Sequence, residues 1–220
     1  VDSAYVSVYY AKKALIQGNT IKNGTDYNGN GLYIYSSTAV VENNTITGHK
    51  GSGIYLETYS DYVDTVTDTI RNNIITGNNT YNNSNWVGGI EVNGYGNHVI
   101  WYNDIYDNSN NYYDLWVGTP YLSGALDARF NYWGTTTTAQ MNEGDNPKDI
   151  DRIYDYYDNN SVSTVNYSNW LSEAGGDPPS NYTELGSILL TDPSGTEVLV
   201  FDPDSTLYVR VTDPDRNADS

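Results

Sequence analysis

The sequence contains no cysteine, one methionine and two histidines among its 220 residues. The absence of cysteine excludes disulfide bonds, thiolate metal sites and a cysteine nucleophile. So few histidine and methionine side chains leave little for binding soft metals, which argues against a role in metal maturation. There is also no run of 18 apolar residues, so we expect no membrane-spanning helix.

Positive charge is scarce as well. Lys and Arg together number 10 against 28 Asp and Glu, which gives a formal net charge of −18 at pH 7. An acidic surface repels polyanions, so we expect the chain to bind neither nucleic acid nor anionic membranes. The lack of a long apolar run predicts that it does not insert into a membrane. The chain opens on Val1 with residues that already follow a structural pattern, so we expect a mature form or a fragment of a longer protein.

What the sequence does contain is an internal repeat. The motif apolar-x-x-Asn-x-apolar recurs with its asparagines 25, 29, 30 and 28 residues apart. These asparagines are Asn19, Asn44, Asn73, Asn103 and Asn131, the last in a degraded copy. Between the copies, glycine is followed by alternating apolar residues, as in GLYIY at 31–35, GIYLE at 53–57 and GIEVN at 89–93. A recurring period of roughly 20–50 residues indicates a solenoid.

Each alternating segment predicts a short strand with one buried face. Helical periodicity is absent before residue 140, and Gly and Asn stand at the corners. The sequence therefore predicts an all-β fold, a right-handed parallel β-helix of about five coils over residues 1–134. An asparagine at a repeated corner tolerates the left-handed backbone conformation, and its side-chain amide can donate to the next coil. We therefore predict that the five asparagines form a structural ladder.

The segment 4–134 resembles the right-handed parallel β-helix repeat family, the pectate-lyase-like superfamily. This superfamily includes pectate lyases, alginate epimerases, phage tailspikes and periplasmic copper-binding maturation proteins. FNYWG at 130–134 is similar to the last coil of many secreted archaeal and bacterial members. The resemblance implies the fold and an extracellular or cell-surface location. It does not select a function, because this fold hosts lyases, hydrolases, epimerases and non-enzymatic surface proteins.

The pattern changes after Gly134. Residues 135–175 are predicted to form a C-terminal cap, with a polar loop and then a short amphipathic helix over 149–158. Residues 176–186 have the composition of a linker. Residues 187–220 contain strand-like runs separated by Asp-Pro turns, and they resemble the opening of an immunoglobulin-like repeat.

Signature strings of enzymes with this fold are missing, because the sequence has no Gly-His-Gly, Asn-Thr-Asp, Asp-Pro-His or Arg-Ile-Lys. The best carboxylates for acid-base chemistry are Glu57 and Glu91, which the alternation directs outward on neighbouring coils. Diagonal neighbours on a sheet are about 7–8 Å apart, within the roughly 5–9.5 Å that separates carboxyl pairs in glycosidases. The simpler interpretation is that they are ordinary exposed carboxylates on a solenoid face.

The same alternation directs aromatic side chains outward in a column, with a carboxylate among them. The residues predicted to bind carbohydrate are Tyr33, Tyr35, Tyr55, Glu91 and Trp116, with Glu57 beside them. Aromatic rings offer flat apolar faces to sugars, and carboxylates accept hydrogen bonds from sugar hydroxyls. The alternative is that these tyrosines are merely typical of an exposed β-sheet face.

Acidic residues also alternate near the end of the chain, at Asp213, Asp215, Asn217 and Asp219. Oxygen ligands at alternate positions begin a calcium-binding loop, so these four residues are a candidate calcium site. The EF-hand pattern fails at its sixth position, where Ala218 replaces glycine. Two Asp-Pro turns on a solvated edge are the alternative interpretation, and no other cofactor is expected.

Together these features favour a non-enzymatic extracellular surface, filament or adhesin module that binds glycans. The expected partners are polysaccharide and further copies of the chain, because strand edges at the ends of a solenoid recruit other strands. The alternative function is a polysaccharide-active enzyme, a lyase or a glycoside hydrolase.

Overall fold

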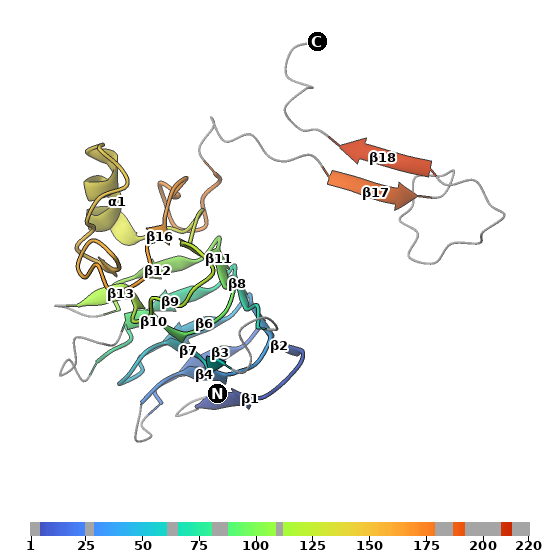
Figure 1. Ribbon diagram of the computed structural model, residues 1–220, viewed down its shortest axis with the longest axis horizontal. Coiled ribbons are helices and arrows are strands. Elements are labelled where there is room, and N and C mark those ends of the chain that lie inside the picture. The colour runs from blue at the N-terminus through green and yellow to red at the C-terminus, as the bar shows by residue number, and fades with distance from the viewer. Residues whose placement is uncertain are drawn as a thin grey trace, which may run out of the picture. The chain divides into compact units, whose positions relative to one another are not determined.

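The computed structural model describes residues 5–24, 29–60, 66–80, 88–108 and 112–178, and the backbone of 187–191 and 208–212. Parallel strands stack into three sheets (Figure 1). The first sheet contains β1 (Val6–Tyr9), β4 (Leu32–Tyr35), β7 (Ile54–Thr58), β10 (Gly88–Gly94), β13 (Tyr113–Val117) and β15 (Ile153–Tyr154). The second contains β2 (Ala14–Gln17), β5 (Ala39–Glu42), β8 (Thr69–Arg71), β11 (Val99–Trp101), β14 (Leu126–Asp127) and β16 (Val165–Asn166). The third contains β3 (Thr20–Lys22), β6 (Thr45–Thr47), β9 (Ile74–Thr76) and β12 (Asp104–Tyr106).

The chain visits these sheets in a fixed order, so each coil contributes one strand to each sheet. Within the described residues, four coils do so completely. The fifth adds β13, β14 and a bridge from Tyr132 to Asp104, and β15 and β16 begin a sixth. This architecture is a parallel β-helix, which confirms the fold predicted from the repeat.

The core consists of aliphatic columns with one residue from each coil. The parallel register places Leu32 beside Ile54, Ile54 beside Ile90, and Ile90 beside Leu115. All four side chains are fully buried. Burying such a side chain contributes about 1.5–3 kcal/mol. The alternating segments of the sequence are therefore the strands that fill the interior.

The predicted asparagine ladder is present at the corner between the second and third sheets. The side chain of each ladder asparagine donates to the Oδ1 atom of the next, over 3.1, 3.0, 2.9 and 3.0 Å. The ladder runs through Asn19, Asn44, Asn73, Asn103 and Asn131. The amide also donates to a carbonyl in the preceding coil, as from Asn73 to Val41 at 2.8 Å. Buried backbone groups at this corner are thereby satisfied.

One detail of the prediction is wrong, because the ladder asparagines do not adopt the left-handed conformation. The residue immediately before each of them does so instead. These residues are Gly18, Asn43, Asn72, Tyr102 and Phe130, with φ between 55° and 68°. The left-handed residue turns the chain, and the following asparagine is thereby free to point inward and bond between coils.

A second polar ladder, which the sequence did not predict, follows the corner after the third sheet. The backbone N–H of His49 donates to Asn78 Oδ1 at 3.3 Å, and Asn78 Nδ2 donates to Asn108 Oδ1 at 2.8 Å. Asn108 Nδ2 in turn donates to Asp114 Oδ1 at 3.0 Å. The ladder ends in an ion pair, with Arg152 Nε 3.0 Å from Asp114 Oδ2.

The helix of the cap lies earlier than predicted. Helix α1 spans Gly134–Asn142 and buries Met141 in the core. The segment 149–158 forms β15 and turns instead of a helix. Ile153 pairs with Leu115 and so continues the aliphatic column, and this tertiary contact outweighs the local helical spacing. Figure 1 shows α1 at the C-terminal end of the coils, where an open solenoid needs a cover.

Residues 180–220 form a second compact unit, separate from residues 1–179. In it, β17 (Ser187–Thr191) and β18 (Tyr208–Thr212) pair antiparallel. The immunoglobulin-like assignment stays a prediction. Among the described residues, no helix has the length and apolar character needed to cross a membrane.

Candidate functional site

The outer side of the first sheet carries two columns of outward side chains, which together we call the aromatic face. One column contains Ser7, Tyr33, Tyr55, Glu91, Trp116 and Tyr154. The other contains Tyr9, Tyr35, Glu57 and Asn93. Strand alternation directs these side chains outward while their neighbours fill the core. All five residues predicted to bind carbohydrate lie on this face, although the role itself stays a prediction.

The tyrosines of this face pack against one another. The rings of Tyr33 and Tyr55 stack with centroids 5.1 Å apart and planes 18° apart. Tyr35 contacts Tyr9, Tyr10 and Tyr59, with centroids 5.6, 5.2 and 5.4 Å away. These separations fall in the range preferred by aromatic pairs, about 4.5–7 Å. The rings thus form a fixed, continuous surface.

Trp116 extends the aromatic surface toward the cap. Its ring stacks on Tyr154 with centroids 5.7 Å apart and planes 15° apart. The ring lies directly over the backbone of Gly118, where an added Cβ would come within 1.8 Å of Trp116 Cη2. Glycine at position 118 therefore allows the tryptophan to lie flat on the sheet.

Glu57 interrupts the tyrosines with a carboxylate. The hydroxyl of Tyr33 donates a short hydrogen bond to Glu57 Oε2. Burial and this carboxylate together raise the pKa of Tyr33 well above its usual value. The phenol consequently stays protonated and holds Glu57 in place.

Glu91 sits between Tyr55 and Trp116 in its column. Its Oε2 atom accepts a hydrogen bond from Ser52 Oγ at 2.8 Å. Burial raises the pKa of Glu91 to about 8, and the negative charge of Glu57 adds to this, while the Ser52 hydrogen bond opposes it. Below that pH Glu91 is a neutral carboxylic acid that can donate a hydrogen bond.

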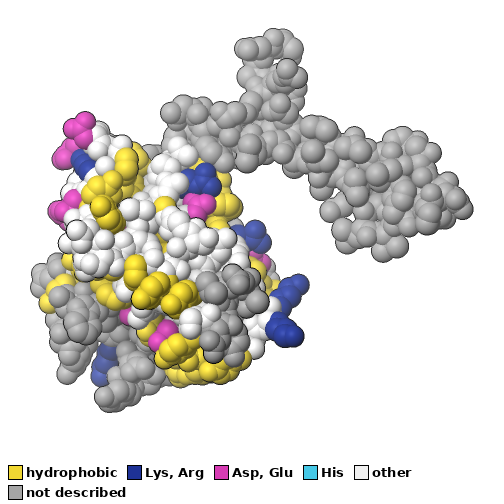
Figure 2. Space-filling view, in the orientation of Figure 1, with side chains coloured by type: hydrophobic (Ala, Val, Ile, Leu, Met, Phe, Trp, Pro, Cys, Tyr) yellow, Lys and Arg dark blue, Asp and Glu magenta, His cyan; other side chains and the backbone are white. Residues whose placement is uncertain are grey.

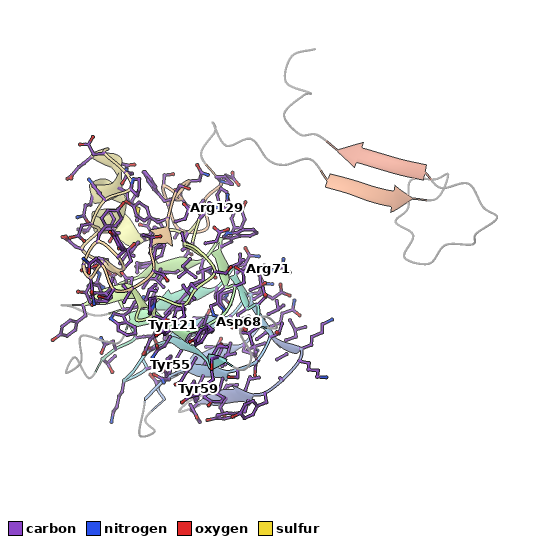
Figure 3. The ribbon with its side chains drawn as sticks, viewed as in Figure 1. Tyr55, Tyr59, Asp68, Arg71, Tyr121 and Arg129 are labelled. Carbon is purple, nitrogen blue, oxygen red and sulfur yellow. The ribbon has the colours of Figure 1, made fainter. Side chains whose placement is uncertain are left out.

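A cleft of about 340 Å³ opens beyond the ends of β7, β10 and β13. Its lining includes Glu57, Tyr59, Asn93, Tyr95, Thr119 and Tyr121. Tyr59 and Tyr121 are about half exposed, at 54% and 55%. In Figure 3, Tyr55, Tyr59 and Tyr121 lie in one region of the solenoid. Sequence reasoning missed Tyr59, Tyr95 and Tyr121, although each follows closely on a predicted strand.

The outer side of the second sheet differs, because its charges pair with one another. Arg71 Nη2 lies 2.7 Å from Glu42 Oε2, and Arg129 Nε lies 2.8 Å from Asp127 Oδ1. The Arg129 guanidinium also lies over the Trp101 ring, 5.4 Å from its centroid. In Figure 2, Lys and Arg side chains lie mainly at the margins of the visible face, whereas hydrophobic side chains form patches across it. The aromatic face is thus the better candidate for an external ligand.

The candidate calcium ligands Asp213, Asp215, Asn217 and Asp219 lie outside the described residues, so calcium stays a prediction. Within the part of the chain that the structure describes, no group of three His, Cys, Asp or Glu side chains is placed to hold a metal ion. Four of the five ladder asparagines are buried, Asn19 in the first coil is exposed, and all five serve the fold.

Comparison with curated proteins and with solved structures found no match. A family model does match, over residues 1–131, which include the first four coils and most of the fifth. Its description is "Protein of unknown function (DUF1565)", and the family is associated with parallel β-helix proteins. Since the match covers more than half of the 220 residues, the chain belongs to the DUF1565 family.

Proposed function

We propose that the chain is a non-enzymatic extracellular module whose aromatic face binds a polysaccharide. The observation that carries this proposal is the packed array of Tyr33, Tyr55 and Tyr35, in which Tyr33 stacks on Tyr55 and meets Tyr35 edge-on. The carboxyls of Glu57 and Glu91 follow these rings in the same two columns. Flat rings cover the apolar faces of sugars, and carboxyl groups bond to their hydroxyls. Strands of successive coils lie about 4.8 Å apart, so a glycan laid along the solenoid meets a new side chain at each coil.

A surface, filament or adhesin setting is part of the same proposal. A net charge of −18 suits an acidic surface exposed to solvent. Cell fractionation with an antibody to the chain tests the location, and recovery in the cytosol alone would overturn it.

The first prediction is that replacing Tyr33 and Tyr55 together by alanine weakens polysaccharide binding about tenfold. Two rings contribute about 0.5–1.5 kcal/mol each, and 1.4 kcal/mol corresponds to a factor of ten. The measurement is affinity electrophoresis on a panel of soluble polysaccharides. Tyr156→Ala is the matched control, because Tyr156 is 47% exposed and belongs to the cap. Equal retardation of the double variant and the control would contradict the proposal.

A second candidate function, cleavage of a polysaccharide, is favoured by one observation. Two carboxyl groups lie at diagonal positions on β7 and β10, and burial raises the pKa of Glu91 to about 8 while Glu57 adds to that shift. Carboxyl pairs in unlike environments divide the roles of acid and base. Glu91 would be the acid and Glu57 the base or nucleophile.

If this pair is catalytic, activity is present below pH 8 and declines as the pH rises through about 8, because Glu91 then loses its proton. Glu91→Gln should lower the rate by roughly 100-fold or more. Release of reducing ends from the same polysaccharide panel measures both effects. No product from any polysaccharide with the unmodified chain would remove this function and leave the binding module.

A further inference from the structure

The cleft beyond β7, β10 and β13 is built by close contacts of the backbone. At Gly94, whose φ is +94°, an added Cβ would come within 1.9 Å of the Thr58 carbonyl oxygen. The buried Thr119 hydroxyl donates to the Gly94 carbonyl at 2.7 Å and accepts from the Tyr121 N–H at 3.1 Å. The bond between Thr119 and Gly94 joins two coils, and the Tyr95 N–H joins the next by donating to the Thr58 carbonyl at 3.0 Å, so the cleft has a fixed shape.

Aromatic side chains form the exposed part of this cleft. Tyr95 and Tyr121 stack with centroids 4.7 Å apart and planes 8° apart. Tyr59 contributes a third ring and contacts Tyr35 of the aromatic face, with centroids 5.4 Å apart. The cleft is therefore continuous with the aromatic face. A volume of about 340 Å³ suits a small ligand or one unit of a polymer.

The polar side chains that line the cleft are a carboxylate, an amide and hydroxyls. Glu57 and Asn93 lie side by side on the neighbouring parallel strands β7 and β10, and Asn93 Nδ2 donates to the Tyr55 hydroxyl at 3.4 Å. Among the lining residues that the structure describes, there is no Lys or Arg. Glu57 supplies a carboxylate that accepts hydroxyl hydrogen bonds and repels negatively charged sugars.

We propose that this cleft binds one uncharged pyranose ring and excludes uronic acids. The ring would stack on the Tyr95–Tyr121 pair while Glu57 and Asn93 bond to its hydroxyls. This inference rests on the proposed function, because the cleft would hold one unit of the glycan bound on the aromatic face. It adds a site and a class of sugar to that function.

The test is isothermal titration with four hexasaccharides. Three are β-1,4-linked and neutral, made of glucose, mannose or N-acetylglucosamine, and the acidic probe is α-1,4-linked galacturonate. We expect at least one neutral hexamer to bind and the galacturonate hexamer not to bind. Tyr121→Ala and Tyr59→Ala should each weaken the neutral hexamer about three- to tenfold. Tyr156→Ala should leave its affinity unchanged, and circular dichroism would confirm that each variant is folded.

The possible outcomes distinguish sugar binding in the cleft from sugar binding on the aromatic face. If neutral hexamers bind, and the Tyr33→Ala, Tyr55→Ala double variant weakens them while Tyr121→Ala and Tyr59→Ala do not, the cleft proposal is wrong and the proposed function stands. If galacturonate binds more tightly than every neutral hexamer, the selection of uncharged sugars is wrong. If no hexamer binds and the polysaccharide panel is also negative, the proposed function fails as well.

Discussion

The Asn73→Leu variant should unfold at a much lower temperature than the unmodified chain. The Asn73 side chain takes part in five hydrogen bonds, and it accepts one from the Asn44 backbone N–H at 2.9 Å. Leucine is similar in size but offers no polar atom. Each buried group left without a partner costs about 1–3 kcal/mol. We therefore expect the free energy of unfolding to fall by about 3 kcal/mol or more. Denaturant unfolding measures this change, and thermal unfolding measures the lower midpoint temperature.

The matched control for this prediction is Asn97→Leu. Asn97 is an exposed asparagine outside the ladder, so its replacement should change the free energy of unfolding by less than about 0.5 kcal/mol. Equal stability of the Asn73→Leu and Asn97→Leu variants would mean that the ladder does not stabilise the stack.

A second large effect is expected for Arg152→Met. Asp114 is almost completely buried, and Arg152 is its ion-pair partner at the end of the second ladder. Burial raises the pKa of Asp114, and the Arg152 guanidinium opposes that shift. Removing one partner of a buried pair costs about 3–5 kcal/mol, because the other charge stays buried. Thermal unfolding at pH 7 would measure this loss.

The stability of the Arg152→Met variant should depend on pH, because burial raises the pKa of Asp114. Without Arg152, the pKa of Asp114 lies further above its value in the unfolded chain, so stability is lost as the pH rises and Asp114 ionises. The loss of stability caused by Arg152→Met should therefore become smaller as the pH falls. Adding Asp114→Asn should restore most of the stability at pH 7.

The control variant Arg71→Met, which removes an exposed partner of Glu42, should lower the free energy of unfolding by less than about 1 kcal/mol. A deficit that persists in the Asp114→Asn, Arg152→Met double variant would refute the charge argument.

The coils could be predicted from the sequence because the same residue types recur at equivalent positions in them. Asparagine recurs at every second-to-third-sheet corner that the structure describes, and apolar residues alternate in β4, β7 and β10 of the first sheet. The second ladder escaped prediction because its positions hold different residue types. His49, Asn78 and Asp114 share only their ability to accept a hydrogen bond, which no fixed motif records.

The candidate site was predictable only in part. Register within a sheet follows from alternation, so the columns that contain Tyr33 and Tyr55 could be derived from the strands. The cleft depends on Tyr59, Tyr95 and Tyr121, which come from loops of different lengths after three strands. The prediction of a cap helix over 149–158 was wrong for a related reason, because the pairing of Ile153 with Leu115 is a tertiary contact that local spacing cannot reveal.

The corner that holds the asparagine ladder also determines where the coils of this chain can vary in length. Two residues separate the second-sheet strand from the third-sheet strand in the first four coils, as at Asn43–Asn44 and Asn72–Asn73. The corner before the second sheet ranges from three residues, at 36–38, to ten, at 59–68. Insertion of one residue at the ladder corner would break the bonds to both neighbouring coils. Loop diversity, and any peptide grafted onto this scaffold, therefore belongs at the corner before the second sheet, which borders the cleft, or after the second ladder at the corner that follows the third sheet.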